Sequence, residues 1–156
     1  MSYVVTGLSP EPFRPLFELS DEALAAQGVL RRTVDANPGF PCRVSLDDAA
    51  VGDTVLLLNY EHQSADTPFR ARHAIYVSQG AREAVRTVDE APAAIRRRAF
   101  ISLRAFDEAG MLVDAEVAPG AELDPVIARL LARPDAAYLH AHYAAMGCFA
   151  ARIDRT

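Results

Sequence analysis

The stretch TVLLLNYEHQ, Thr54 to Gln63, constrains the architecture of this chain most strongly, because it joins an unbroken apolar run to a cluster of polar side chains. The apolar residues Val55 to Leu58 favour a strand that is buried on both faces, and we expect this strand to lie in the centre of a sheet. A buried strand normally ends in turn formers such as Gly, Asn or Asp. The side chains of Asn59 to Gln63 can instead bind, titrate or donate hydrogen bonds, so the end of this strand is a candidate site.

Other strand signals stand on both sides of this segment. His73 to Ser78 alternates between two faces with the two-residue period of a strand. The segments Ala99 to Phe106 and Met111 to Val117 are joined by Asp107 to Gly110, whose final glycine suits the left-handed residue of a hairpin turn. Weaker signals predict further extended segments at Tyr3–Thr6, Leu30–Val34, Cys42–Leu46, Ala136–Tyr143 and Cys148–Ile153.

Helix signals are fewer, and the predicted helices are short. Ser9-Pro10 and Ser20-Asp21 are typical helix starts, and Glu90-Ala91-Pro92 can open a third helix. The most regular helix begins at Asp124 and ends before Pro134. Its apolar residues fall at helical spacing, as Leu123, Ile127, Leu130 and Leu131.

These elements predict an α+β fold with a largely antiparallel sheet and about three or four short helices. The regular alternation of strand and helix that indicates a parallel sheet is missing. Because hairpin follows hairpin, such a sheet twists strongly and can curl into a partial barrel. A length of 156 residues fits a single domain, 1–156, and no linker divides the chain.

Composition excludes several partners. Basic residues are scattered except for Arg96 to Arg98, and the net charge is -5, so we expect no nucleic-acid partner. No apolar run approaches the roughly 20 residues of a spanning helix, so we expect no membrane partner. The N-terminus has no signal-peptide pattern, and Cys42 and Cys148 are expected to be free thiols in a reducing compartment. The chain is therefore expected to be cytoplasmic.

His140 and His142 form the second polar cluster. Their rings project from the same face of a strand, with Cα atoms roughly 6.5 to 7 Å apart, a spacing that can chelate one metal ion. A third ligand would have to come from His62 or Glu61. Because neither a third histidine nor a cysteine pair stands close to these two residues in the sequence, we expect no tightly bound metal. We also expect no cofactor, since no glycine-rich fingerprint follows a strand and precedes a helix. The three histidines are then candidate catalytic proton carriers or satisfied polar groups.

Tyr60 and Glu61 stand beside His62 at the end of the apolar strand. Tyr60 shares a face with His62 and is a candidate catalytic residue; alternatively, its ring closes the core with the hydroxyl at the rim. Glu61 points to the other face and is a candidate ligand-binding residue. Its alternative is a surface ion pair with Arg70 or Arg72.

Cys42 and Arg43 follow the turn-forming Gly39-Phe40-Pro41. A planar guanidinium at such a turn suits a carboxylate or phosphate, so Arg43 is a candidate ligand-binding residue. An ion pair with Asp47 or Asp48 is its alternative. The neighbouring guanidinium can also lower the pKa of the Cys42 thiol and place it in the same site, although free cysteines usually act as small buried hydrophobes.

The chain resembles a known family along nearly its whole length. The landmarks of the resemblance are Gly39 to Arg43, Leu56 to Gln63, Arg104 to Asp107 with Gly110 to Asp114, and His140 to His142 with Gly147 to Phe149. They are similar to those of a bacterial family of domains of unknown function. The resemblance implies a small bacterial single-domain protein, and no activity comes with it.

Two hypotheses of function remain. In the first, a small cytosolic enzyme or ligand-binding protein acts on a small anionic metabolite by hydrolysis or group transfer, with Arg43 holding the anion and a histidine moving protons. In the second, the histidines and tyrosines cross the interface of a non-catalytic interaction or dimerisation module, such as a homodimer. Convergence of His62, His140 and His142 in a concave pocket would favour the first hypothesis, whereas a flat, self-complementary surface would favour the second.

Overall fold

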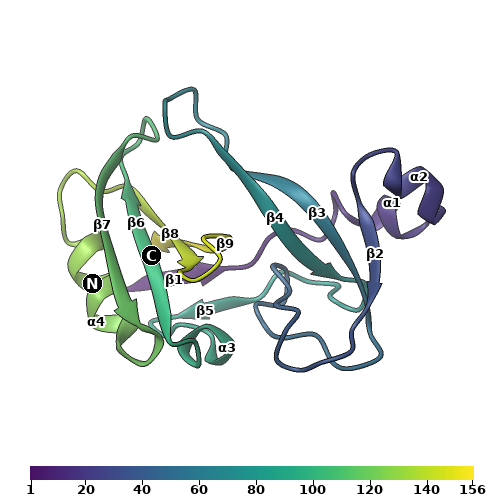
Figure 1. The fold of residues 1–156 in the computed structure, drawn as a ribbon. Helices are drawn as coiled ribbons and strands as arrows, with labels where there is room; N and C mark the ends of the chain where they lie inside the picture. The colour runs from purple at the N-terminus through teal and green to yellow at the C-terminus, as the bar shows by residue number, and fades with distance from the viewer.

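The computed structural model describes all residues from 1 to 156 and contains two separate antiparallel sheets (Figure 1). The predicted α+β class is therefore confirmed. Both sheets are open, so the partial barrel that the sequence pattern allowed is not formed. No helix of the protein combines the length and the apolar character needed to cross a membrane.

The larger sheet has the strand order β5-β1-β9-β8-β6-β7. Its strands are β1 (Tyr3–Thr6), β5 (Arg86–Val88), β6 (Phe100–Phe106), β7 (Leu112–Pro119), β8 (Tyr138–Tyr143) and β9 (Phe149–Arg155). The smaller sheet has the order β2-β3-β4, with β2 (Leu30–Thr33), β3 (Thr54–Gln63) and β4 (Ala71–Ser78). The helices are α1 (Arg14–Phe17), α2 (Asp21–Ala25), α3 (Ala93–Arg96) and α4 (Leu123–Leu131), and a 3-10 turn, η1, spans Gly120–Glu122.

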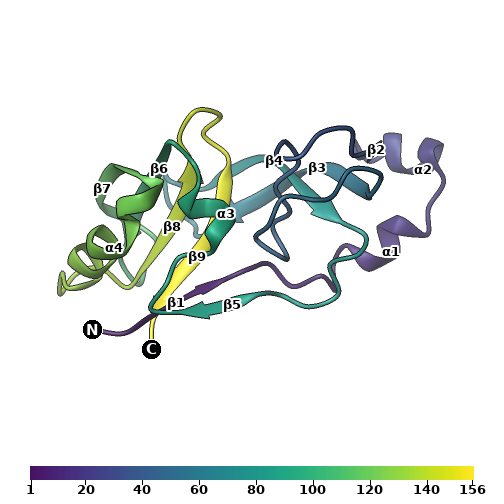
Figure 2. The ribbon, with the colours of Figure 1, turned by 90° about the horizontal axis from the view of Figure 1, so that it is seen from below.

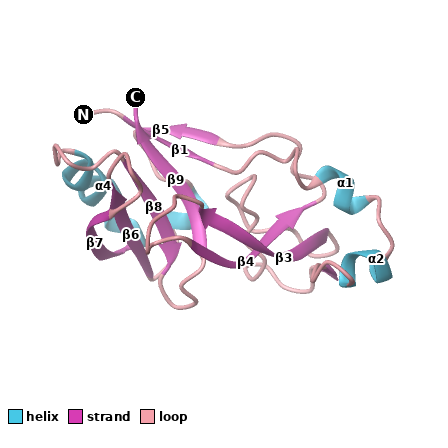
Figure 3. Cartoon of the chain, turned by 90° about the horizontal axis from the view of Figure 1, so that it is seen from above, coloured by secondary structure: helices cyan, strands magenta, loops and turns pink.

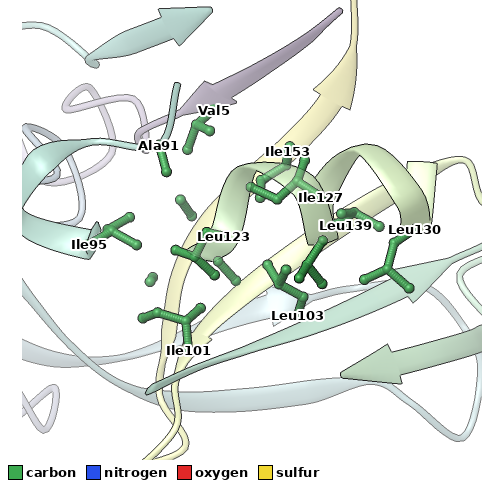
Figure 4. Packing of buried hydrophobic residues seen from close by; sticks show 14 of the residues in the cluster. Val5, Ala91, Ile95, Ile101, Leu103, Leu123, Ile127, Leu130, Leu139 and Ile153 are labelled. Atoms are coloured by element: carbon green, nitrogen blue, oxygen red, sulfur yellow. The ribbon is translucent and has the colours of Figure 1, made fainter. Parts of the chain in front are cut away.

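The main core lies between the larger sheet and α4. The apolar face of α4, including Leu123, Ile127 and Leu130, packs against side chains of β6, β8 and β9, among them Leu103 and Leu139 (Figure 4). The spacing of these leucines and isoleucines in the sequence predicted this face, because residues three and four apart lie on one side of a helix. In Figure 2 the two chain ends lie side by side, where β1 pairs with β9.

The smaller sheet has its own core at the other end of the molecule. β3 lies between β2 and β4, so the predicted central position of this strand is confirmed. Leu56 and Ile75 pack there with Phe13 and Leu24, which come from the region of α1 and α2. Figure 3 shows α1 and α2 at one end of the molecule and α4 at the opposite end, with the sheets between them.

The loop Pro41–Leu46 joins the two cores. Val44 packs in the core of the smaller sheet, whereas Leu46 packs in the core of the larger one. The prediction of an extended segment at Cys42–Leu46 is wrong: isolated bridges at Pro41 and Cys42 are followed by a turn, and Leu46 has a φ of 53°, which a strand does not allow. The apolar residues of this segment are buried because it is wedged between two layers.

One edge strand was not predicted from the sequence, whereas one hairpin was. The edge strand β5 was not predicted, since it is only three residues long and half-exposed to exposed, without a buried stripe. The hairpin of β6 and β7 was predicted, and Gly110 at its turn has a φ of 84° that favours glycine.

We expect Ile127→Ala to lower the free energy of unfolding by about 2–5 kcal/mol, because it removes a fully buried side chain between α4 and the sheet. Arg129→Ala, on the exposed face of the same helix, removes only an ion pair with Glu116 and should cost less than about 1 kcal/mol. Urea denaturation monitored by circular dichroism measures both values. Equal losses in the two variants would contradict the assignment of the core.

Candidate functional site

His62, His140 and His142 converge at the junction of the two sheets. His62 comes from the end of β3 in the smaller sheet, and the other two come from β8 in the larger sheet. One ligand nitrogen from each ring lies within 4.8 Å of the others. His140 and His142 are 3% and 0% exposed, whereas His62 is half-buried. The three rings thus meet in the interior and do not spread over a flat surface.

The strand geometry explains how β8 supplies two of the rings. His140 and His142 are two residues apart, so their side chains project from the same face. Leu139 and Ala141, on the opposite face, pack in the core beneath α4. The same-face arrangement predicted from the sequence is therefore present.

A β-bulge places the third ring. Glu61 pairs with Arg72 and Gln63 pairs with Ala71, so His62 is the extra residue of β3 at this point. A bulge bends its strand and re-aims a side chain, which here turns the imidazole towards β8. The sequence pattern predicted that His62 lies at the end of this strand, but nothing in the sequence indicated the bulge.

Gln63 is a positioning residue that the sequence analysis did not single out. Its side chain is buried and donates a hydrogen bond from Nε2 to the hydroxyl of Tyr138 at 2.9 Å. Tyr138 is the first residue of β8, so this bond ties the end of β3 to the strand that carries His140 and His142. A glutamine at the end of an apolar strand was the available signal, but its partner lies 75 positions away in the chain.

The three imidazoles carry nitrogens that the protein leaves without a partner. These buried atoms are Nδ1 of His62, Nδ1 of His140 and Nε2 of His142. His142 Nδ1 lies 3.0 Å from the carbonyl oxygen of Gly147 and must donate to it, since a carbonyl only accepts. The proton on Nδ1 leaves the lone pair on Nε2. Such a carbonyl bond fixes the tautomer and orientation of histidines that bind metals.

Aromatic rings enclose the cluster. Phe149 stacks on His62 with ring centroids 5.4 Å apart and an angle of 5° between the planes, and it meets His140 edge-on at 5.1 Å. Phe106 lies 5.1 Å from His140 on another side. Neither phenylalanine was predicted as a site residue, because an aromatic residue on a strand is usually part of the core.

This apolar setting keeps the imidazoles neutral. Burial lowers the pKa of His62 to about 4 and the pKa values of His140 and His142 to about 3, and the positive charge of Arg104 adds to the effect. A proton carrier at neutral pH works best with a pKa near 7. A metal ion, by contrast, requires imidazoles that are already deprotonated. The electrostatics therefore suit metal ligands better than the predicted proton carriers.

Tyr60 and Glu61 lie next to this cluster but do not join it. The ring of Tyr60 is half-buried against Phe13 and Phe149, at 6.1 and 6.4 Å, and burial raises the pKa of its phenol. It thus closes the core, as its alternative interpretation held. Glu61 forms an ion pair with Arg72 at 3.4 Å, which was also its alternative.

Arg43 and Cys42 are buried but do not join the cluster of three histidines. The guanidinium of Arg43 donates from Nε to the carbonyl of Phe149 at 2.7 Å and from Nη1 to the carbonyl of Pro41. The alternative ion pair with Asp47 or Asp48 is not formed, because these carboxylates bind Arg97 and Arg98 instead. The Sγ atom of Cys42 accepts backbone N–H bonds from Val44 and Ser78, as a buried structural thiol does.

The donor set fits a small divalent ion such as zinc. A tetrahedral ion with Zn–N bonds of about 2.0–2.1 Å places its ligand atoms about 3.4 Å apart. One nitrogen of each ring lies within 4.8 Å of the others, so the rings would have to close by at most about 1.4 Å to reach that distance. The expectation of no tight metal rested on a missing third ligand, and the fold removes that reason by bringing His62 to the pair.

Fold and site together define an α+β protein with a buried three-histidine cluster between two antiparallel sheets. Residues 39–155 match the family model described as "Protein of unknown function (DUF1203)", and the chain belongs to this family. The predicted resemblance to a family of unknown function is thereby confirmed. The matched region contains all three histidines and the loop that carries Arg43. No curated protein and no solved structure matches the chain.

We expect His140→Leu to raise the free energy of unfolding of the metal-free protein by about 1–2 kcal/mol. The reason is that Nδ1 of His140 is buried without a hydrogen-bond partner, which costs free energy that an apolar side chain does not incur. Gln63→Leu is the matched control, since it breaks a satisfied buried bond and should lower stability by a similar amount. Urea unfolding in the presence of a chelator measures both. A destabilised His140→Leu variant would mean that this nitrogen is a structural group.

Proposed function

We propose that this protein binds one divalent transition-metal ion, zinc in the first instance, between His62, His140 and His142. The observation that carries the proposal is the convergence of the three rings: one nitrogen of each lies within 4.8 Å of the others, and each ring has a buried nitrogen without a hydrogen-bond partner. Native proteins leave few buried polar atoms unsatisfied, and three from one cluster call for a common partner. A cation that accepts three lone pairs is such a partner.

Three ligands favour a reactive site over a structural one. Structural zinc sites are closed by four protein ligands, whereas catalytic sites use three and keep one position for water or substrate. No cysteine or carboxylate joins the three histidines in this cluster. An ion held there would polarise a substrate oxygen or lower the pKa of a bound water. Metal-assisted hydrolysis or group transfer is therefore the reaction class that we propose.

Arg104 supports an anionic substrate for this site. It pairs across the strands with His140, so the two side chains leave the sheet on the same face. Arg104 is half-buried and forms no ion pair with any carboxylate, and burial lowers the pKa of its guanidinium. A free guanidinium beside a metal site would attract a carboxylate or phosphate and stabilise negative charge that develops during the reaction.

The competing hypothesis of an interaction module has less support. His140 and His142 are buried inside one chain and cannot present their rings to a partner surface. The cytoplasm remains the compartment that we propose, because both cysteines are unpaired thiols.

Metal titration tests the proposal. Protein purified without a histidine tag and stripped with a chelator should bind about one equivalent of Zn²⁺ by calorimetry, and Co²⁺ should give the visible absorption bands of a low-coordinate site. His62→Ala, His140→Ala and His142→Ala should each weaken binding at least 100-fold. His73→Ala removes the only other histidine, which lies on β4 outside the cluster, and should bind as the wild type does.

Two results would overturn the proposal. One is a wild-type protein that takes up no stoichiometric metal. The other is a His73→Ala variant that loses metal as fully as the variants of the cluster.

Metal should also stabilise the fold. At a free Zn²⁺ concentration of 100 times Kd, the free energy of unfolding should rise by about 2.7 kcal/mol. Thermal denaturation with and without Zn²⁺ measures the change, and His142→Ala should show none of it. The same stabilisation in His142→Ala would mean that the ion binds elsewhere on the protein.

A further inference from the structure

A cavity of about 530 Å³ lies between the smaller sheet and the turn that joins β8 to β9. None of the three clustered histidines lines it, so it is distinct from the proposed metal site. Its size is that of a small-molecule site. Most of its wall is apolar, with Pro41, Leu57, Ala74 and Met146 among the lining residues.

The cavity wall has basic side chains but no acidic ones. The wall contains Arg43, Arg98 and His73, and no carboxylate. Arg98 is neutralised by Asp48, whose carboxylate lies 2.7 Å from its Nη2 atom. Arg43 has no such counter-charge: it is 2% exposed and forms no ion pair. A buried charge without an opposite charge is costly, so this guanidinium needs an anion.

The guanidinium of Arg43 is held ready for a ligand. Two backbone carbonyls, of Phe149 and Pro41, accept from its Nε and Nη1 atoms and fix the plane of the group. Its Nη2 atom donates to no protein acceptor. A guanidinium fixed in this way loses little conformational entropy when an anion binds.

Tyr143 supplies a second unused group at the same wall. It is 8% exposed, and its hydroxyl has no hydrogen-bond partner. Two guanidinium groups lie near its ring, with the Cζ atoms of Arg43 and Arg98 at 5.0 and 5.3 Å from the ring centroid. The buried Nε atom of Arg98 is also without a partner. A buried hydroxyl beside two cations is well suited to donate to an anion.

We propose that this cavity binds a small organic anion, a carboxylate or phosphate monoester with an apolar body. Arg43 and Tyr143 hold the anionic group, and Leu57, Tyr76 and Met146 contact the apolar body. The anion supplies the counter-charge that Arg43 lacks and satisfies the hydroxyl of Tyr143. This site goes beyond the proposed metal function and does not depend on it.

Binding measurements on the chelator-treated protein test this inference, because an anion cannot then bind through a metal ion. The probes are benzoate and phenyl phosphate, with benzamide and benzyl alcohol as neutral analogues and inorganic phosphate as an anion without an apolar body. We expect the two aromatic anions to raise the melting temperature and to bind by calorimetry. The neutral analogues and inorganic phosphate should bind at least tenfold more weakly.

Variants locate the binding. Tyr143→Phe should weaken benzoate and phenyl phosphate about tenfold, whereas Tyr3→Phe, which removes a hydroxyl that bonds Asp124 outside the cavity, should leave their affinity unchanged. Ala74→Leu places a larger side chain in the exposed part of the wall and should abolish binding. Arg43→Met should abolish binding as well. If loss of Arg43 prevents folding, Tyr143→Phe and Ala74→Leu still decide the test.

Three outcomes would overturn the inference: no aromatic anion binds, the neutral analogues bind as tightly as the anions, or the Tyr143→Phe and Ala74→Leu variants bind like the wild type. Retained anion binding in a protein that takes up no metal would reject the metal proposal alone. Metal uptake without anion binding would reject the cavity alone.

Discussion

The docking of the two sheets depends on a buried hydrogen bond, from the guanidinium of Arg43 to the backbone carbonyl of Phe149. It reaches from the loop beside the smaller sheet to the backbone of Phe149 in β9, and the low local dielectric strengthens this charge-assisted bond. Its consequence extends to the histidines, because the ring of Phe149 stacks on His62 and borders His140. The residue that docks the sheets thus also sets one wall of the candidate metal site.

The candidate site exists only while the sheets are docked. His62 belongs to one sheet, and His140 and His142 belong to the other. The contacts that hold them together are tertiary, and they include the Arg43 bond, the hydrogen bond from Gln63 to Tyr138 and the packing of Leu46 in the core of the larger sheet. Any opening between the layers would separate the three nitrogens, so an ion that binds all of them also opposes that opening.

Local patterns predicted the elements but not their docking. The apolar run predicted β3, the turn ending in glycine predicted the hairpin of β6 and β7, and the helical period predicted α4, because these signals depend on neighbours in the chain. The same-face placement of His140 and His142 follows from the strand period alone. The approach of His62 does not, since it requires a bulge and a contact between two sheets. Arg43 shows the same limit: a guanidinium beside a turn suggested an anion-binding residue or a surface ion pair, and only the packing of the loop Pro41–Leu46 buries it.

The buried polar atoms without hydrogen-bond partners lower the stability of the ligand-free protein. Buried polar groups are normally satisfied, yet this chain leaves imidazole nitrogens at the junction of the sheets and a tyrosine hydroxyl in the neighbouring cavity unpaired. Each such group costs free energy in the ligand-free protein, and an apolar residue of similar size would avoid that cost. A native protein that keeps such groups has a reason for them, such as a catalytic role or a bound water or ion. The two clusters differ in what they lack: the imidazoles have free lone pairs and call for a cation, whereas Arg43 and Tyr143 have free protons and call for an anion.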